Sequence, residues 1–191
     1  MNPIKNKKDL EYTIDQIKNF AYSYLEKYSP SQQQLKTYLY KKLIKNKQHI
    51  SSKKEIFNLI DVVIETLISQ KLLSDEYYSE AKSRSLLRRG YSLNKIRYNL
   101  IQKGISEKYI KSSISKIKEN ESDPDFFSAI KMCKRRRIGP IRDDNNRSLF
   151  YKKDISILAR SGFSYDLSKK VLDLPKEEFK KFNLTEIKNP W

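Results

Sequence analysis

Arginine, the side chain best suited to bind phosphate, is confined to one part of this chain. All ten arginines lie between residues 84 and 160, whereas lysine occurs along the whole chain. The guanidinium group is a planar fork that pairs with phosphate through two hydrogen bonds and stacks on bases and aromatic rings. The net charge of +17 also favours a polyanionic partner. The alternative explanation is compositional, because a chain rich in Lys, Ile, Asn and Tyr is basic everywhere.

The arginine window and its neighbouring lysines give the predicted contact set for nucleic acid or a nucleoprotein filament. Arg84 and Arg88 are four residues apart and share one face of a helix. Arg88 and Arg89 also fit a solvated helix end, where cations interact favourably with the helix dipole. The predicted contact residues are Arg84, Arg88, Arg89, Arg97, Lys103, Lys134, Arg135, Arg136, Arg137, Arg142 and Arg147.

The remaining reactive side chains do not form a catalytic or metal-binding pattern. The chain contains no GxxxxGK[ST], GxSxG or HExxH motif. Asp143 and Asp144 stand among basic residues, so they are interpreted as local charge balance rather than metal ligands. His49 is the only histidine and Cys133 the only cysteine, and neither has the neighbours of a zinc site. The sequence therefore predicts a protein that is not an enzyme and holds no cofactor or metal.

Five tyrosines near the arginine window could stack on nucleobases. A tyrosine at helical spacing more often packs between helices with its hydroxyl in water, and this interpretation is favoured here. Tyr91 and Phe163 each follow a glycine and are interpreted as packing wedges. The five tyrosines are Tyr77, Tyr78, Tyr91, Tyr98 and Tyr109.

The composition favours a helical protein of the cytoplasm. With only four glycines and six prolines, the chain does not resemble a β protein with many turns. No apolar run approaches the roughly 20 residues of a membrane helix, and the start, MNPIKNKKDLEY, lacks the apolar stretch of a secretory signal. A single cysteine fits a reducing compartment. The expected location is therefore cytoplasmic, with no membrane partner.

Apolar spacing predicts three helices in the first part of the chain. A helix over residues 9–27 is followed by a break at 29–31. Ser31 with Gln34 forms a capping box that opens the next helix. A second capping box, Ser52 with Glu55, opens a strongly apolar helix. The expected buried residues are Ile14, Ile17, Ala21, Leu25, Leu35, Leu39, Leu43, Ile56, Ile60, Val63 and Leu67.

The same scheme recurs twice. A helix over 76–89, with Tyr78, Ala81 and Ser85 on one side, ends at Gly90, because glycine adopts the left-handed conformation found at helix ends. Ser92 and Ser106 are the expected caps of the two helices that follow. A further helix begins at 123–125 and runs into the basic residues 134–137. A polar connector over 142–147 then precedes helices over 152–160 and after Ser164.

Three serine caps align as an internal repeat. Ser31, Leu35 and Leu39 match Ser92, Ile96 and Leu100, and the third copy is Ser164, Ser168 and Leu172. Repeats of this kind bury their apolar faces against neighbours and form arrays. The expected fold is all-α, with three tandem three-helix modules in an elongated, curved array. The expected spans are a flexible N-terminus over 1–8, modules over 9–75, 76–122 and 123–174, and a C-terminal tail over 175–191.

Three stretches in this order resemble the RecX family. They are LLSDEYYSEA at 72–81, RRGYSLNKIRYNLIQKGIS at 88–106, and CKRRRIGPIR at 133–142 followed by LARSGFSYDLSKKVL at 158–172. The last looks like the third module of the alphaproteobacterial branch of the family. The first module departs from the family pattern, since Ser29-Pro30 stands where a basic residue often precedes the serine.

The resemblance implies a fold of three tandem three-helix modules in a monomer. It also implies partners and an activity. RecX-like proteins bind RecA, lie along the groove of the filament that RecA forms on single-stranded DNA, and inhibit its ATPase and strand exchange. The resemblance thus predicts a regulator of homologous recombination and DNA repair, with RecA, its filament and DNA as partners.

Two other functions fit the residues. Serine-capped helices are typical of helix-turn-helix transcription factors, but a recognition helix would carry Arg, Asn or Gln in its first turn. The first turn after Ser92 carries Leu93, Asn94 and Lys95, and no dimerisation segment is evident. The other candidate is a basic helical-repeat protein that binds DNA or RNA independently of RecA.

Overall fold

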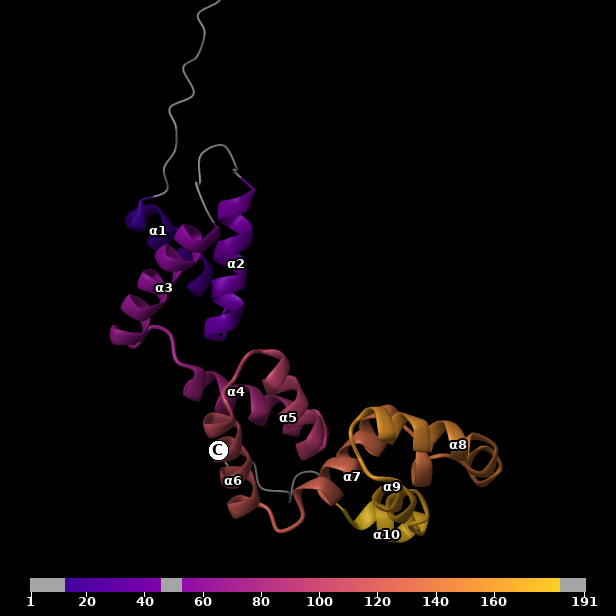
Figure 1. Ribbon diagram of the computed structural model, residues 1–191. Coiled ribbons are helices and arrows are strands. Elements are labelled where there is room, and N and C mark those ends of the chain that lie inside the picture. Colours follow the sequence, from indigo (N-terminus) through magenta and orange to yellow (C-terminus); the bar gives the residue numbers. More distant parts are fainter. Residues whose placement is uncertain (1–12, 46–52, 183–191) are drawn as a thin grey trace, which may run out of the picture. The chain divides into compact units, whose positions relative to one another are not determined.

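The computed structural model describes residues 13–45 and 53–182, which are helical and divide into two compact units (Figure 1). The first unit ends at Tyr78 and the second begins at Ser79, so the boundary falls inside α4, Asp75–Arg88. No strand occurs in the described residues. The prediction of an all-α fold of tandem three-helix modules is confirmed, whereas the module boundaries and the elongated, curved shape stay predictions.

The first unit contains α1, Ile14–Leu25, α2, Gln32–Ile44, and α3, Lys53–Ser69. The capping box at Ser31 is confirmed, and a second one at Thr13 opens α1. The predicted box at Ser52 and the flexible N-terminus over 1–8 lie outside the described residues. The core residues are Ile17, Ala21, Leu35, Leu39, Leu43, Ile56, Ile60, Val63, Ile64, Leu67 and Leu73.

The second triplet comprises α4, α5, Leu93–Gln102, and α6, Glu107–Asn120. Its α4 buries Ser79, Ser83 and Leu86, so the face predicted from Tyr78, Ala81 and Ser85 was one step out of register. Small serines suit this position because the hydroxyls of Ser79 and Ser113 lie 2.8 Å apart between α4 and α6. The Ser106 side chain makes no capping hydrogen bond, contrary to prediction.

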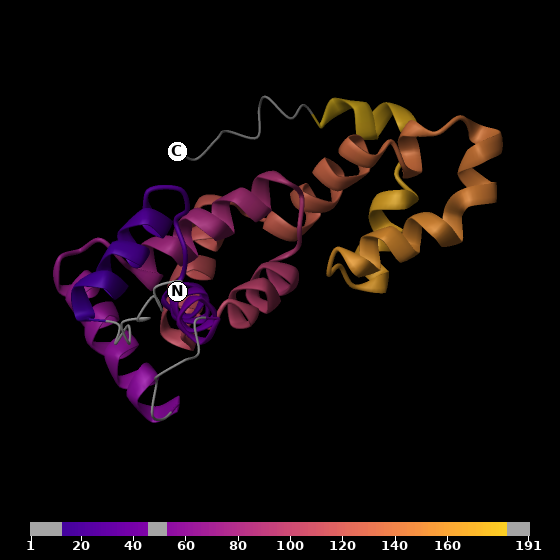
Figure 2. The same cartoon turned by 90° about the horizontal axis from the view of Figure 1, so that it is seen from above.

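The third triplet contains α7, Pro124–Arg136, a short 3-10 helix, Gly139–Ile141, α8, Asp144–Arg160, and α9, Tyr165–Leu172; α10, Lys176–Lys181, follows in the predicted tail. Figure 2 shows these helices, in orange and yellow, from above. The predicted connector over 142–147 was wrong. The Asp143 carboxylate accepts the Asn146 N–H at 2.9 Å and caps α8, so the polar run is the first turn of a helix.

The serine register is confirmed in all three copies. The side chains of Ser31, Ser92 and Ser164 accept a backbone N–H three residues later. The residues four and eight positions after each serine are buried, including Ser168 in the place of a larger side chain. Ser168 is accommodated because its hydroxyl donates to the Ser164 carbonyl at 2.8 Å.

Five helices end in the same hydrogen-bond pattern, a Schellman motif. In each motif one residue lies in the left-handed conformation and donates to the carbonyl three residues back. The next residue donates to the carbonyl five residues back. The left-handed positions are Lys71, Gly90, Gly104, Arg137 and Gly162. Glycine fits this conformation without cost, so the two basic residues are the exceptions.

In each of the first two triplets, the first backbone N–H of the second helix donates to an aspartate. This aspartate lies in the first turn of the following triplet. Gln32 donates to Asp75 at 2.8 Å, and Leu93 donates to Asp125 at 2.7 Å. Burial raises the pKa of both carboxyl groups, and the backbone hydrogen bond opposes the rise. In the second unit, Ser92 also donates to the Ser161 carbonyl at 3.2 Å, which joins α5 to the end of α8.

Candidate nucleic-acid interface

The glycine at the end of α4 brings two arginine-rich segments together. A Cβ atom at Gly90 would lie 2.8 Å from both the Met132 nitrogen and the Ser128 oxygen. Only a residue without a side chain therefore allows the end of α4 to touch the backbone of α7. This contact places residues 88–91 beside α7, which begins only at Pro124.

Tyr91 lies between two guanidinium groups at this junction. The guanidinium carbon of Arg89 is 5.4 Å from the centre of the Tyr91 ring, and that of Arg135 is 5.8 Å away. Both distances are typical of a cation–π interaction. Arg135 also donates to the Met132 sulfur at 3.5 Å. The half-buried tyrosine thus orients Arg89 and Arg135. Because the ring carries no charge, both guanidinium groups keep their positive charge.

We use the name arginine cluster for Arg88, Arg89, Arg135, Arg136 and Arg137. All five side chains are exposed. Within residues 13–45 and 53–182, none of the five forms an ion pair with a carboxylate. Surface cations without anionic partners retain their full attraction for phosphate, and Arg137 holds its position in a left-handed conformation that favours glycine.

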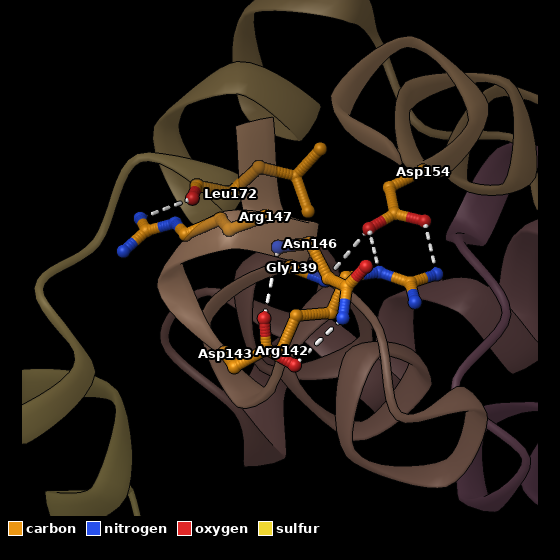
Figure 3. A network of polar contacts seen from close by, with 7 residues as sticks. All are labelled: Gly139, Arg142, Asp143, Asn146, Arg147, Asp154 and Leu172. Carbon is orange, nitrogen blue, oxygen red and sulfur yellow. Dashed lines mark hydrogen bonds and ion pairs between the residues drawn. The ribbon is translucent and has the colours of Figure 1, made fainter. Parts of the chain in front are cut away.

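Arg142, by contrast, forms an ion pair with Asp154 within the third triplet (Figure 3). Its Nε and Nη2 donate to the two oxygens of Asp154 at 2.8 and 2.9 Å. The Asp154 carboxylate is 1% exposed and also accepts the Gly139 N–H at 2.9 Å. These hydrogen bonds raise the pKa of the Arg142 guanidinium above its usual value. The contact of Arg142 with a polyanion stays a prediction, and in the structure its guanidinium group forms this two-pronged pair with Asp154.

Arg147 and Lys134 also make contacts within the fold. Arg147 donates to the carbonyls of Leu172 and Leu174 at 2.6 and 2.8 Å, so it ties the end of α9 to α8 (Figure 3). Lys134 donates to the Phe182 carbonyl, and its ammonium lies 5.6 Å from the Phe179 ring centre. Both residues were predicted as ligand contacts; this stays a prediction, and the structure shows them bonded within the third triplet and its tail.

The other predicted contact residues lie apart from the arginine cluster. Arg97 forms an ion pair with Glu107 at 2.8 Å between α5 and α6. Lys103 caps the end of α5 and is half-buried, as is Arg84 in α4. Six of the eleven predicted residues are thus engaged or half-buried, and five remain as the arginine cluster.

The polar side chains outside the arginine cluster have structural roles. Hydrogen bonds from Asn146 lower the pKa of the Asp143 carboxyl, as expected for a helix cap. Burial, with a smaller effect of Asp154, raises the pKa of the Cys133 thiol to about 12, so this cysteine is not a reactive thiolate. No group of potential metal ligands occurs in the described part of the chain. His49 lies outside that part.

The tyrosine prediction was partly wrong. Tyr78, Tyr91 and Tyr109 are half-buried, but Tyr77 and Tyr98 are 67% and 53% exposed. Phe163 is buried, as a packing wedge should be. Helical spacing alone could not separate these cases, because a tyrosine at the edge of an apolar face meets either core or water.

The first turn of α5 is covered by the third triplet. The N–H groups of Ser92 and Leu93 are bonded to Ser161 and Asp125, and the Gly162 backbone approaches the Ser92 hydroxyl closely. A recognition helix inserts this same turn into the major groove of DNA. The arrangement of α5 therefore argues against a helix-turn-helix function for this helix.

The fold and its helix caps define an all-α protein of tandem three-helix modules, each with a helix that is capped by a serine side chain. No described helix has the length and apolar character needed to cross a membrane. Residues 74–113 match the family model described as RecX, second three-helix domain. Over these residues the chain is therefore similar to the RecX family.

Individual proteins named RecX are similar to more of the chain. The chain is 29% identical over 159 residues to regulatory protein RecX of Myxococcus xanthus, covering 82% of this chain and 84% of the relative. It is 30% identical over 155 residues to regulatory protein RecX of Streptococcus uberis, covering 81% of this chain but only 53% of that relative. A crystal structure of RecX from Lactobacillus salivarius shares the fold, with a TM-score of 0.56, 18% identity, and coverage of 88% of this chain and 97% of that one.

Proposed function

We propose that this protein regulates homologous recombination by binding RecA and its filament on single-stranded DNA, inhibiting ATP hydrolysis and strand exchange. The relatives are named regulatory proteins, and the second triplet matches the family model. The observation that carries the DNA part of the proposal is the arginine cluster, with its five exposed cations free of carboxylate partners among the described residues.

The charge of the second unit supports binding to a filament. Residues 79–182 carry 26 lysines and arginines against 13 acidic residues, a net charge of +13. A filament on single-stranded DNA is a polyanion with many equivalent sites. Several modest contacts along it would add up through multivalency, and a bound protein would hold neighbouring RecA subunits in fixed spacing.

The decisive experiment is the ATPase assay of RecA on single-stranded DNA, with this protein titrated well below one molecule per RecA. We expect a fall in rate with the wild-type chain. Replacement of Arg135, Arg136 and Arg137 by alanine should weaken inhibition and reduce the slope of log K against log salt by about 2, at about 0.7 per lost phosphate contact.

A control variant loses the same three positive charges at positions outside the arginine cluster. Lys111, Lys152 and Lys169 are exposed lysines of the second unit, and their replacement by alanine removes the same charge. Equal loss of inhibition in both triple variants would assign the effect to net charge and remove the arginine cluster from the mechanism. Wild-type protein that leaves the ATPase unchanged but binds RNA would favour a RecA-independent helical-repeat protein instead.

A further inference from the structure

The first unit has an apolar pocket at the turn between α3 and α4, and none of its lining residues belongs to the arginine cluster. Its volume is about 640 Å³, and all its lining residues lie between residues 22 and 78. Tyr28, Leu72 and Tyr77 line it and are 58%, 54% and 67% exposed. Large apolar side chains are therefore presented to solvent around one hollow, which is typical of an interaction site.

The Schellman turn beside the pocket combines two unusual features. Its left-handed residue is Lys71 rather than glycine, a feature that it shares with the turn at Arg137. The following residue, Leu72, is 54% exposed, whereas the matching Ile105, Ile138 and Phe163 are at most 5% exposed and Tyr91 is half-buried. In such a motif this residue normally makes a hydrophobic contact with its own helix.

The core of the first unit does not need Leu72. The next residue, Leu73, is 3% exposed and fills the place beneath the turn. Tyr28 is likewise the outer member of a row in which Tyr24 stacks on Tyr38 at 4.1 Å and meets Tyr28 at 4.8 Å. Packing within the first unit therefore does not account for the exposure of these apolar side chains. Binding of a ligand would account for it.

The charge around the pocket indicates the kind of ligand. The described residues of the first unit carry nine lysines against seven acidic residues, a net charge of only +2. The pocket itself is lined by one acid, Glu26, and one base, Lys71. A balanced surface does not attract a polyanion, but it complements a neutral apolar segment of a protein.

We propose that this pocket is a docking site for a protein partner that inserts a bulky apolar side chain between Tyr28, Leu72 and Tyr77. The identity of that partner as a RecA subunit rests on the function proposed above. The volume exceeds that of one aromatic side chain, so a short segment with one or two apolar residues fills it. Such buried anchors carry most of the binding energy at protein interfaces.

The test separates protein binding from DNA binding. The double variant Leu72→Ser with Tyr77→Ser is compared with Leu149→Ser with Tyr165→Ser, which removes the same two residue types, 74% and 63% exposed, from the second unit. Affinity for RecA protein without DNA and affinity for single-stranded DNA are measured separately. The pocket variant should bind RecA at least tenfold more weakly and bind DNA normally, and the control variant should match wild type in both.

Several outcomes would overturn the proposal. If the pocket variant binds RecA as the wild type does, the pocket is not the docking site, although the filament function stands. If it loses DNA affinity instead, the ligand is a nucleobase stacked on the tyrosines. If wild-type protein binds neither RecA nor its filament, the proposed function and this inference both fail. Thermal unfolding of each variant checks that these exposed substitutions leave the fold intact.

Discussion

The two units of this protein differ in net charge and in the kind of side chain that they expose. The second unit has a net charge of +13 over its described residues and gathers arginines around Tyr91. The first unit has a net charge of +2 over its described residues and presents tyrosines and a leucine around a pocket. Both are built from three-helix modules with serine caps, so the shared fold does not dictate the character of the surface. The residues at helix ends account for the difference.

The difference is concentrated at the Schellman turns. At the end of α4 the left-handed residue is glycine, and the turn packs tightly against α7. At the ends of α3 and α7 it is Lys71 and Arg137, and both side chains are exposed. Glycine is thus required at Gly90, where the turn meets another helix, whereas the turns at Lys71, Gly104 and Arg137 face solvent.

The largest effect on stability is expected from the buried ion pair between Arg142 and Asp154. Asp154→Asn removes the charge that pairs with Arg142 and weakens the hold on Gly139, two residues after Arg137. We expect the free energy of unfolding, measured in urea, to fall by about 2–4 kcal/mol. Asp61→Asn in the first unit breaks a half-exposed ion pair with Lys36 and should cost less than about 1 kcal/mol. Equal effects would mean that the buried pair adds nothing beyond a surface contact.

An intermediate effect should distinguish the two exceptional turns. Glycine relieves the left-handed backbone at either position, so Arg137→Gly and Lys71→Gly should each raise the free energy of unfolding by about 0.5–1 kcal/mol. Only Arg137→Gly should also weaken binding to single-stranded DNA, because only this residue belongs to the arginine cluster. Weaker DNA binding by the Lys71 variant, in the same titration, would contradict the division between the two units.

The smallest effect concerns pH, and here the two units should behave alike. Burial raises the folded-state pKa of Asp75 and Asp125, so the folded protein holds these protons more tightly than the unfolded chain does. Their contribution to stability therefore falls as the pH rises through the folded-state pKa. Asp75→Asn and Asp125→Asn keep an oxygen acceptor and should flatten this fall relative to wild type, measured by urea unfolding from about pH 3 to pH 6.

A control of opposite sign is available in the same chain. Hydrogen bonds from Asn146 lower the folded-state pKa of Asp143, so its contribution is present above the unfolded-state pKa and is lost as the pH falls. Asp143→Asn should therefore lose stability at neutral pH and converge with wild type in acid. The same trend in the Asp125 variant would show that hydrogen bonding outweighs burial there.

Local patterns allowed much of the fold to be predicted from the sequence. A serine followed by apolar residues at four and eight positions fixes both the start of a helix and its buried face, and all three copies were correct. Gly90 and Gly104 were recognised as helix ends because few other residues tolerate a left-handed backbone. The start of α8 was missed, although an Asp three residues before an Asn in a polar run is compatible with a cap.

The candidate sites could be predicted only in part, because they depend on contacts between distant residues. The arginine window was visible, but nothing local reveals that Arg142 pairs with Asp154 while Arg89 and Arg135 share Tyr91. The pocket was missed altogether. Leu72 and Leu73 are identical in type and adjacent, and only the three-dimensional course of the turn decides that one is exposed and the other buried.

A ribosome makes Gln32 before Asp75 and Leu93 before Asp125, so each second helix emerges with its first N–H still lacking this acceptor. The acceptor is synthesised 43 and 32 residues later, respectively, in the first turn of the following helix triplet. The first two triplets are therefore completed by the beginning of the triplet that follows, which favours ordered folding from the N-terminus during translation. A nascent chain that stalls before Asp75 holds three helices whose second helix has not yet met its aspartate.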